Sequence, residues 1–390
     1  MKALKISLLL LLSVWQIHAQ DNIEQLLQEI EENSTQLAAV REETEAQRLE
    51  NRSDLNPHDP EVEFNYFWGT PSAIGNRTDF SITQSFDFPT AYLHKKKIAD
   101  LSNENLSFAY QAKRKNLLFE AKQICIELVY YNAMHQEYNQ RLEHAQSIAN
   151  MYEVQYTMGS ANILEKNKAK LNLIQVENEI KNIEIEQSRL LSKLQVLNGG
   201  KAIAWNAVNL HPSRLPNNFT EWYAEASADN PILQSMHQQK IIANQQVKLN
   251  TAMNLPKLTT GYMSEKMVGE HFRGFTLGVS IPLWENRNKV KQAKAKVKAS
   301  EASIKDIEIE WYNHLEHLFL KAQSLESNML QYRQALIDFN NENYLKQALD
   351  AGEISLLNYL LEIEFYYGTK QKALEISRDY EMTVAELMRY

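Results

Sequence analysis

The chain has 390 residues with only 11 Gly and 9 Pro, so turns are sparse and the secondary-structure elements must be long. Its 41 Lys and Arg against 49 Asp and Glu give a formal net charge of −8, which disfavours nucleic acid as a partner because phosphate binding needs a basic surface. The single cysteine, Cys125, cannot form a disulfide within the chain and lies in a helical pattern, where we expect a packed side chain.

The N-terminus predicts an export signal over residues 1–19. Lys2 and Lys5 supply a positive region, and the apolar run Ile6–Trp15 is too short to span a bilayer. Ala19 ends a stretch that resembles a small-residue cleavage site, so the mature chain would begin at Gln20. A buried N-terminal helix is the alternative interpretation.

Residues 20–198 are expected to form a first repeat, in which a helix is followed by two strands and a helical hairpin. The strands, at about 61–68 and 78–88, alternate apolar and polar side chains with the period of two that is typical of a strand. The apolar positions are Val62, Phe64, Tyr66, Trp68, Phe80, Ile82, Phe86 and Phe88.

A long helix should follow these strands, because Leu93 to Tyr156 contains neither Pro nor Gly. At 1.5 Å per residue this segment would be roughly 95 Å long. Apolar side chains recur at alternating spacings of four and three from Leu117 onward, and again from Ala169 to Leu197, which predicts coiled-coil seams. Gly159 between the two seams can take the positive φ of a tight reversal, so the helices should form an antiparallel hairpin that turns near residue 159.

After an inter-repeat segment at 199–221, residues 222–390 repeat the same order of elements at an offset of roughly 195 residues. Two further strands are expected at about 257–265 and 272–282, and a second hairpin should turn near Gly352. The seam of its first arm is read through Ala293, Ile304, His314 and Leu318 among other positions. The fold class is therefore mainly α with a small β part, in two tandem repeats.

The four strands share one apolar, aromatic face and one face of small polar and acidic residues. No spare helices remain to cover the apolar face, so lipid is its expected environment, with water on the polar face. Backbone groups in lipid must all be paired, and the smallest closed membrane barrels have about eight strands. Several chains must therefore contribute four strands each to one barrel.

With these features the sequence resembles the TolC-type outer-membrane efflux family over almost the whole mature chain. The motif Ser280-Ile-Pro-Leu-Trp284, which runs into an Ala/Lys helix, carries the resemblance together with its counterpart Gln84-Ser-Phe-Asp-Phe-Pro89, which is closest to the heavy-metal-efflux branch. Around the hairpins, Tyr156 and Gly159 match the family pattern in the first repeat. In the second repeat Gly352 matches, but Asn358 stands where the family usually has Asp.

The resemblance implies a homotrimer with a shared transmembrane β-barrel of twelve strands and a periplasmic α-barrel built from the helical hairpins. It also implies that the hairpin tips meet a periplasmic adaptor protein, which connects the channel to an inner-membrane pump. The short chain predicts a reduced equatorial segment near 202–222. The expected location is the outer membrane, in contact with its lipid, with a periplasmic extension.

The candidate adaptor-binding residues flank the two tight turns, where we expect exposed positions: Met158, Gly159, Ser160, Ala351, Gly352, Glu353 and Ser355. Glu165 and Asn358 occupy equivalent places six residues after each turn glycine and are the pore or gate candidates, since a ring of carboxylates would favour cations. Plain loop residues and a solvated surface charge are the alternative interpretations.

We find no sequence pattern for catalysis or for a cofactor, because no Gly-rich phosphate loop and no nucleophile motif occurs. His314 and His317 share a helix face but have no Cys or carboxylate set to complete a metal shell. The predicted function is thus a passive outer-membrane export duct for small molecules or metal ions, and not an enzyme. The alternative is a secreted coiled-coil scaffold or binding protein with a small soluble sheet.

Overall fold

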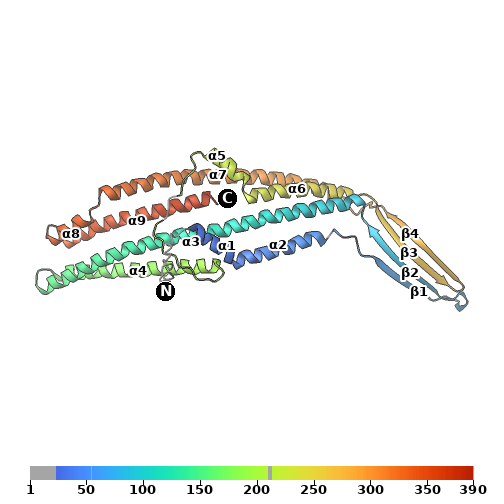
Figure 1. Ribbon diagram of the computed structural model, residues 1–390, viewed down its shortest axis with the longest axis horizontal. Coiled ribbons are helices and arrows are strands. Elements are labelled where there is room, and N and C mark those ends of the chain that lie inside the picture. The colour runs from blue at the N-terminus through green and yellow to red at the C-terminus, as the bar shows by residue number, and fades with distance from the viewer. Residues whose placement is uncertain (1–22, 54, 210–212, 390) are drawn as a thin grey trace, which may run out of the picture. The chain divides into compact units, whose positions relative to one another are not determined.

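The computed structural model describes residues 23–53, 55–209 and 213–389, so the predicted export signal over 1–19 lies outside the described residues. Figure 1 shows a chain of long helices and one four-stranded sheet. The elements before residue 199 are α1 (Ile23–Asn33), α2 (Thr35–Ser53), β1 (Glu61–Phe67), the 3-10 turn η1 (Ser72–Ile74), β2 (Arg77–Phe86), α3 (Pro89–Thr157) and α4 (Ile163–Leu197). The elements after it are α5 (Phe219–Ala228), α6 (Pro231–Ala252), β3 (Lys257–Met267), β4 (Glu270–Ser280), α7 (Lys289–Asp338), α8 (Glu342–Asp350) and α9 (Leu356–Leu387).

The order helices, two strands, helical hairpin occurs twice, which confirms the predicted fold class of two tandem repeats. Both second strands are shorter at their C-terminal ends than the alternation suggested. β2 ends at Phe86 and β4 at Ser280, each shortly before a proline, which cannot donate a backbone hydrogen bond to a ladder.

The first arm of the second hairpin is broken, and the expectation of one long helix there is wrong. α7 ends at Asp338, and α8 begins at Glu342 after the pair Asn340-Asn341. Asparagine side chains compete with the backbone for its hydrogen bonds, which favours an interruption at this place. The break is held from another element, because the Tyr366 hydroxyl donates to Asn340 Oδ1 at 3.0 Å.

Contacts between residues divide the chain into two compact units, each drawn from both repeats. The first unit contains the described residues up to Leu37 together with Lys115–Asn217 and Glu316–Arg389. The second contains Ala38–Arg114 and Asn218–Leu315. Helices α3 and α7 contribute to both, so the hairpin turns lie in the first unit and the sheet lies in the second.

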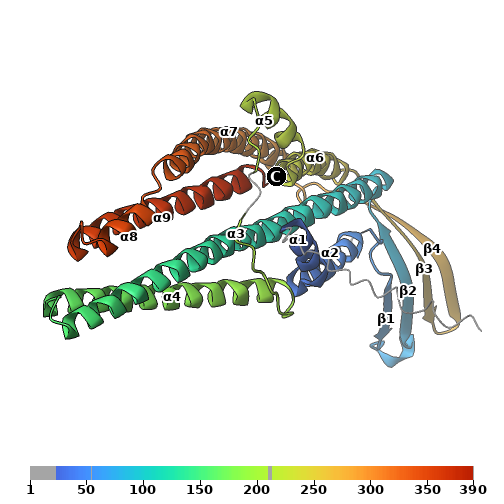
Figure 2. The same ribbon diagram turned by 60° about the vertical axis from the view of Figure 1, so that its left-hand side comes forward.

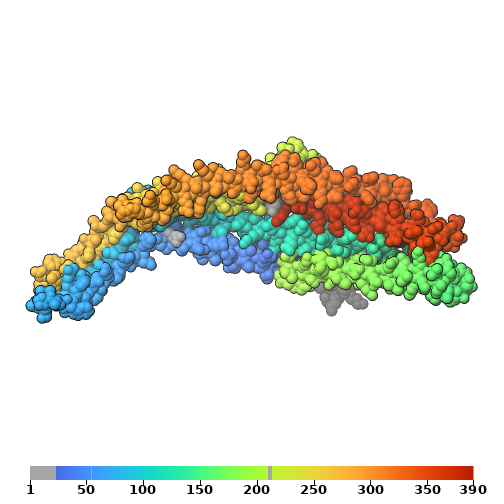
Figure 3. Space-filling model, turned by 180° about the vertical axis from the view of Figure 1, so that it is seen from behind, coloured from blue at the N-terminus to red at the C-terminus, as the bar shows by residue number. Residues whose placement is uncertain are grey.

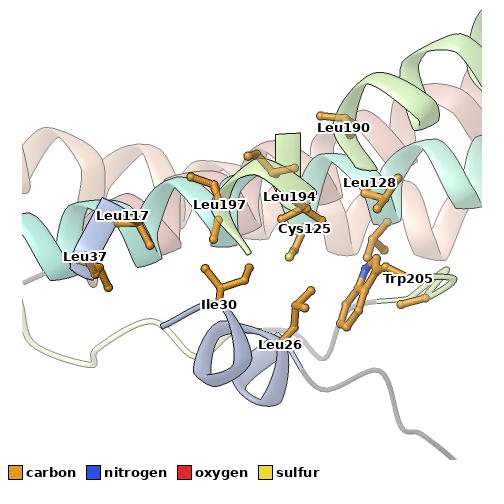
Figure 4. Close-up of a cluster of buried hydrophobic side chains, with 14 residues drawn as sticks. Leu26, Ile30, Leu37, Leu117, Cys125, Leu128, Leu190, Leu194, Leu197 and Trp205 are labelled. Carbon is orange, nitrogen blue, oxygen red and sulfur yellow. The ribbon is translucent and has the colours of Figure 1, made fainter. Parts of the chain in front are cut away.

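The core of the first unit gathers where α1 packs on α3 and α4 (Figure 4). Its buried members include seam residues that the periodicity predicted, namely Leu117, Ala121, Ile124, Leu128, Leu190, Leu194 and Leu197. Cys125 is fully buried among them, as expected for a packed side chain, and this burial raises the pKa of its thiol to about 12. Among the described helices, none combines the length and the apolar character that a bilayer-spanning helix requires.

Trp205 and Ala207 also belong to this core, although their segment was expected to be only a connection between the repeats. Asn132 of α3 fixes the segment, since its amide donates to the carbonyl of Trp205 at 3.3 Å and to the carbonyl of Ala207 at 2.9 Å. Gln187 of α4 in turn donates to Asn132 Oδ1 at 2.7 Å. The segment between the repeats therefore packs on the first hairpin beside Asn132 and Gln187, away from the turn at Gly159.

The seam predicted along α7 is wrong at position 314, one turn before its last member. His314 is exposed, whereas Leu315 is buried and Leu318 is buried as predicted. A helix with 3.6 residues per turn drifts against a strict seven-residue pattern, so a seam read over several turns can lose its phase.

Candidate functional site

The sheet places its apolar side chains on one face because its register keeps like positions opposite each other. The strands are antiparallel in the order β1-β2-β3-β4 (Figure 2). Val62 pairs with Ile82, Ile82 with Tyr262, and Tyr262 with Phe275, so one apolar row crosses all four strands. Directly opposite residues point to the same side of a sheet, so this apolar face follows from the register.

The polar face carries the acidic residues of the strands. Glu61 pairs with Thr83, Thr83 with Gly261, and Gly261 with Thr276 in the row next to the apolar one. The same parity places further acidic residues on this face: Glu63, Asp79, Glu265 and Glu270. Phe67, Met263, Met267 and Phe272 share this face, which is therefore not uniformly polar.

The apolar face lies open within the chain. Phe275 exposes 90% of its surface and Leu277 exposes 86%, and Val62 and Phe64 are also exposed. A contiguous apolar surface of this kind marks a site for a partner or for lipid. The alternation of apolar and polar side chains that the sequence predicted is thus present, and none of the described residues covers Phe275 or Leu277 on the apolar side.

The second candidate surface consists of the two hairpin turns, which have the same backbone geometry. At the first turn Gly159 has φ 77°, and the carbonyl of Gln155 accepts from the backbone N–H of Ser160 at 2.9 Å. At the second turn Gly352 has φ 73°, and the carbonyl of Ala348 accepts from the backbone N–H of Glu353 at 2.9 Å. Both are helix ends closed by a residue in the left-handed region, as the glycines predicted.

The side chains around these turns are accessible. Met158, Ser160, Ala351, Glu353 and Ser355 are all exposed, so the predicted adaptor-binding residues present a free surface within this chain. Ser355 caps α9, because its hydroxyl accepts from the backbone N–H of Asn358 at 3.2 Å.

Glu165 and Asn358 occupy the same place after their turns, at the third position of α4 and of α9. Glu165 is half-buried and engaged in a capping box with Asn162, whereas Asn358 is exposed. Position 165 therefore has a structural function of its own, whether or not its charge reaches a pore.

Between α3, α8 and α9 lies a cluster of charges, the Arg141 network, that the sequence did not indicate. The buried guanidinium of Arg141 (α3) lies 4.3 Å from the ring centre of Tyr138 and 4.3 Å from that of Tyr367 (α9), and it donates to the carbonyl of Tyr367 at 3.1 Å. Lys370 Nζ lies 3.1 Å from Glu137 Oε2 and 3.4 Å from Glu342 Oε2. The network thus joins α3, α8 and α9.

The network also shifts ionisation within the first unit. Burial raises the pKa of Tyr367 above its usual range, and the neighbouring Glu342 reinforces the effect. Burial alone would lower the pKa of Lys370, but Glu137 and Glu342 outweigh it, so the pKa of Lys370 is raised. Sequence periodicity does not mark Glu137, Glu342 or Lys370, because these residues meet only when distant helices pack.

Beside the network a groove of about 400 Å³ runs between α9 and the α3–α4 hairpin. Tyr138, Glu179, Ile363 and Gln371 are among its lining residues. Figure 3 shows the red α9 against the teal and green helices α3 and α4 at this place. In the parts of the chain that the structure describes, no group of three His, Cys, Asp or Glu side chains could hold a metal ion.

Comparison with known proteins identifies the fold. No protein-family model and no curated protein sequence matches this chain. Among solved structures, the Campylobacter jejuni CmeC outer-membrane channel matches 95% of this chain and 85% of its own, with a TM-score of 0.77 and 14% identity. CusC, a transmembrane channel, covers 95% and 91%, with a TM-score of 0.78 and 17% identity. The outer-membrane protein VceC of Vibrio cholerae covers 94% of each chain, with a TM-score of 0.75 and 14% identity.

Proposed function

Since this chain has the fold of TolC-type outer-membrane channels, as its sequence suggested, we propose that it is the outer-membrane duct of an export system. It acts as a passive channel and performs no chemistry. The observation that carries the proposal is the open apolar face of the sheet, opposite a face that bears the acidic residues of the strands. The apolar face contacts lipid, and the face with the acidic residues lines a water-filled lumen.

The free edges of the sheet support assembly from several copies. β1 and β4 are the outermost strands, and among the described residues each pairs on one side only. Unpaired backbone groups at a sheet edge are costly in lipid, so β1 of one copy pairs with β4 of the next until the sheet closes. Three copies give a barrel of twelve strands, and their helical hairpins form the periplasmic α-barrel.

The hairpin turns are the contact site for a periplasmic adaptor, which links the duct to an inner-membrane pump that supplies the energy. Their exposed side chains and matching geometry support this assignment. The residues are Met158, Gly159, Ser160, Ala351, Gly352, Glu353 and Ser355. Glu165 and Asn358 lie close behind these turns, where a pore would be narrowest, and the cargo is a small molecule or a metal ion.

Cell fractionation and mass measurement in detergent test this proposal. The mature chain, without its first 19 residues, should be found in the outer membrane, require detergent for extraction and have the mass of three copies. It should also conduct ions in a planar bilayer. A freely soluble monomer would contradict the proposal and would favour a secreted coiled-coil scaffold with a small soluble sheet.

Crosslinking tests the docking of the adaptor separately. Cysteines introduced as Ser160→Cys and Ser355→Cys should crosslink to the adaptor in intact cells. A matched control is Ser192→Cys on α4, far along the sequence from both turns, which should give no crosslink. Equal crosslinking at all three positions, or at none of them, would argue against docking at the turns.

A further inference from the structure

The charges of the sheet are divided between its two faces. On the polar face the register places the acids Glu61, Glu63, Asp79, Glu265 and Glu270. On the apolar face the strands carry no carboxylate, and their Lys, Arg and His side chains are Lys266, His271 and Arg273. This separation gives the apolar face a chemical character beyond its hydrophobicity.

The three basic residues, which we name the basic rim, lie together at the end of the sheet where β1 turns into β2 and β3 into β4. Lys266 pairs directly with His271, and Ser264 in the adjoining row pairs with Arg273. Arg273 Nη2 lies 3.1 Å from His271 Nδ1, and Ser264 Oγ lies 2.8 Å from His271 Nε2. All three basic side chains are exposed.

The basic rim differs from the polar face in its ion pairs. Among the described residues, neither Lys266 nor Arg273 forms an ion pair with a carboxylate, and Glu265 and Glu270 point to the opposite face. Arg77 on the polar face shows the contrast, because its Nε lies 2.8 Å from Asp79 Oδ1 and 3.2 Å from Glu265 Oε1. The rim therefore offers unneutralised positive charge.

The basic rim borders the apolar band. Along β2 the band runs from Phe86 to Phe80, and the six steps between them, at about 3.3 Å each, give a length along the strand of roughly 20 Å. Next to this band lie Tyr66 of β1 and Trp68, which directly follows β1. Their rings contact each other edge to face, with ring centres 5.3 Å apart. Aromatic side chains at the border of an apolar band are typical of the depth at which lipid headgroups begin.

We propose that the basic rim binds the phosphate groups of anionic lipids in the membrane leaflet at the turn end of the sheet. The inference rests on the proposed function, because it requires the apolar face to contact lipid. Arg273 can donate two parallel hydrogen bonds to one phosphate, and Lys266 adds a point charge. A lipid fits the whole surface, since its chains cover the apolar band while its headgroup meets the rim; a free phosphate matches the rim alone.

The test compares lipid retention by the mature trimer purified in neutral detergent. Phosphatidylglycerol and phosphatidylcholine are added in equal amounts, and the lipids that remain bound are counted by native mass spectrometry. The wild type should retain phosphatidylglycerol in preference, and this preference should fall as salt increases. In the double variant Lys266→Gln, Arg273→Gln, the ratio of bound phosphatidylglycerol to bound phosphatidylcholine should fall by about fivefold for each cation removed.

The matched control removes two positive charges from the polar face, as Arg77→Gln with Lys257→Gln. This variant should keep the preference of the wild type. An equal loss of preference in both double variants would assign the effect to net charge and refute lipid binding by the basic rim. A wild type that shows no preference for phosphatidylglycerol would also refute it. Inorganic phosphate should not displace the lipid at equal concentration; if it does, the rim is a phosphate site and not a lipid site.

Trimer mass and flotation with liposomes are measured in the same preparations. They separate the two proposals. A wild type that neither inserts nor trimerises would refute the channel and the rim together, whereas an inserted trimer that retains both lipids equally would refute the rim alone.

Discussion

Asn162 and Glu165 form a reciprocal capping box at the start of α4. Asn162 Oδ1 accepts from the backbone N–H of Glu165 at 3.0 Å, and Glu165 Oε2 accepts from the backbone N–H of Asn162 at 2.9 Å. Two of the donors that a helix N-terminus leaves unpaired are satisfied in this way. A side chain proposed to face a pore therefore also holds the hairpin turn together.

Substitutions at position 165 can separate these two roles. Glu165→Ala should lower the free energy of unfolding of the hairpin by about 1 kcal/mol, because the cap loses one side. Glu165→Gln keeps a hydrogen-bond acceptor but removes the charge, so it should leave stability nearly unchanged. Thermal unfolding followed by circular dichroism measures both changes. Block of the channel by divalent cations should weaken in Glu165→Gln if the carboxylate faces the pore, and unchanged block would leave the cap as its only role.

The turn glycines are expected to act through backbone conformation alone. At Gly352, φ is 73° and nothing lies within 4 Å of a Cβ placed there, so Gly352→Ala should cost about 1 kcal/mol without a steric clash. Gly368 supplies the control, because it lies inside α9 with equally open surroundings. Gly368→Ala should raise the free energy of unfolding by up to about 1 kcal/mol. Two effects of the same sign in urea unfolding would contradict this explanation.

Arg141 should be the most sensitive charged residue of the first unit. Arg141→Ala should lower the free energy of unfolding by about 3 kcal/mol, because it removes a buried cation stacked between two tyrosines and leaves Glu137 with one partner fewer. Arg378→Ala is the control. Arg378 also lies over a tyrosine ring, at 4.6 Å from Tyr130, but is more exposed, so its loss should cost less than about 1 kcal/mol. Comparable losses in denaturant unfolding would refute the ranking.

Alkaline pH should loosen the hairpin end of the chain. Burial raises the pKa of Tyr359 from 10.0 to about 12, so the folded chain holds this proton more tightly than the unfolded chain. Its contribution to stability is therefore complete below pH 10 and is lost as the pH rises towards 12. Tyr359→Phe should flatten the fall in melting temperature over this interval. A wild type and variant with the same slope between pH 10 and 12 would contradict the assignment.

The sheet offers the sharpest distinction between a channel and a soluble scaffold. Phe275→Lys changes a side chain that is 90% exposed, which in water would have almost no effect. In a lipid-facing barrel the same change should cost about 2–4 kcal/mol at mid-membrane depth and reduce the amount of trimer in the outer membrane. Thr276→Lys, the next residue on the polar face, should be tolerated. Equal yields of both variants would place the apolar face outside lipid.

Much of this architecture could be predicted because the backbone itself imposes the period. Strand residues two apart must share a face, so the sides of β2 and β4 that carry Ile82 and Phe275 follow from the sequence once the strands are located. The register that aligns them through Tyr262 comes from the structure. The seam along α4 was predictable for the same reason, and Ala169, Leu173 and Leu190 are buried as expected. Gly159 and Gly352 marked the turns because few other residues accept a positive φ.

What could not be predicted depends on contacts between distant segments. Arg141 and Glu342 are polar residues in helical sequence, and nothing local distinguishes them from solvated charges. Trp205 covers a core to which its own segment contributes no periodic pattern. The break at Asn340 required a local preference and a distant tyrosine to act together, and a single residue of drift moved the α7 seam from His314 to Leu315.

The unpaired edges of β1 and β4 have a consequence for the assembly of the protein. Under the proposed function, a newly exported copy would bear unpaired main-chain groups along the outer edges of β1 and β4, and an exposed apolar face between them. Further copies of the chain would be needed to pair both edges, so assembly would depend on the concentration of the protein as well as on its sequence. At low concentration the protein would remain as aggregation-prone monomers. The cell would then need chaperones that bind these monomers, or it would need to deliver several copies to one site together.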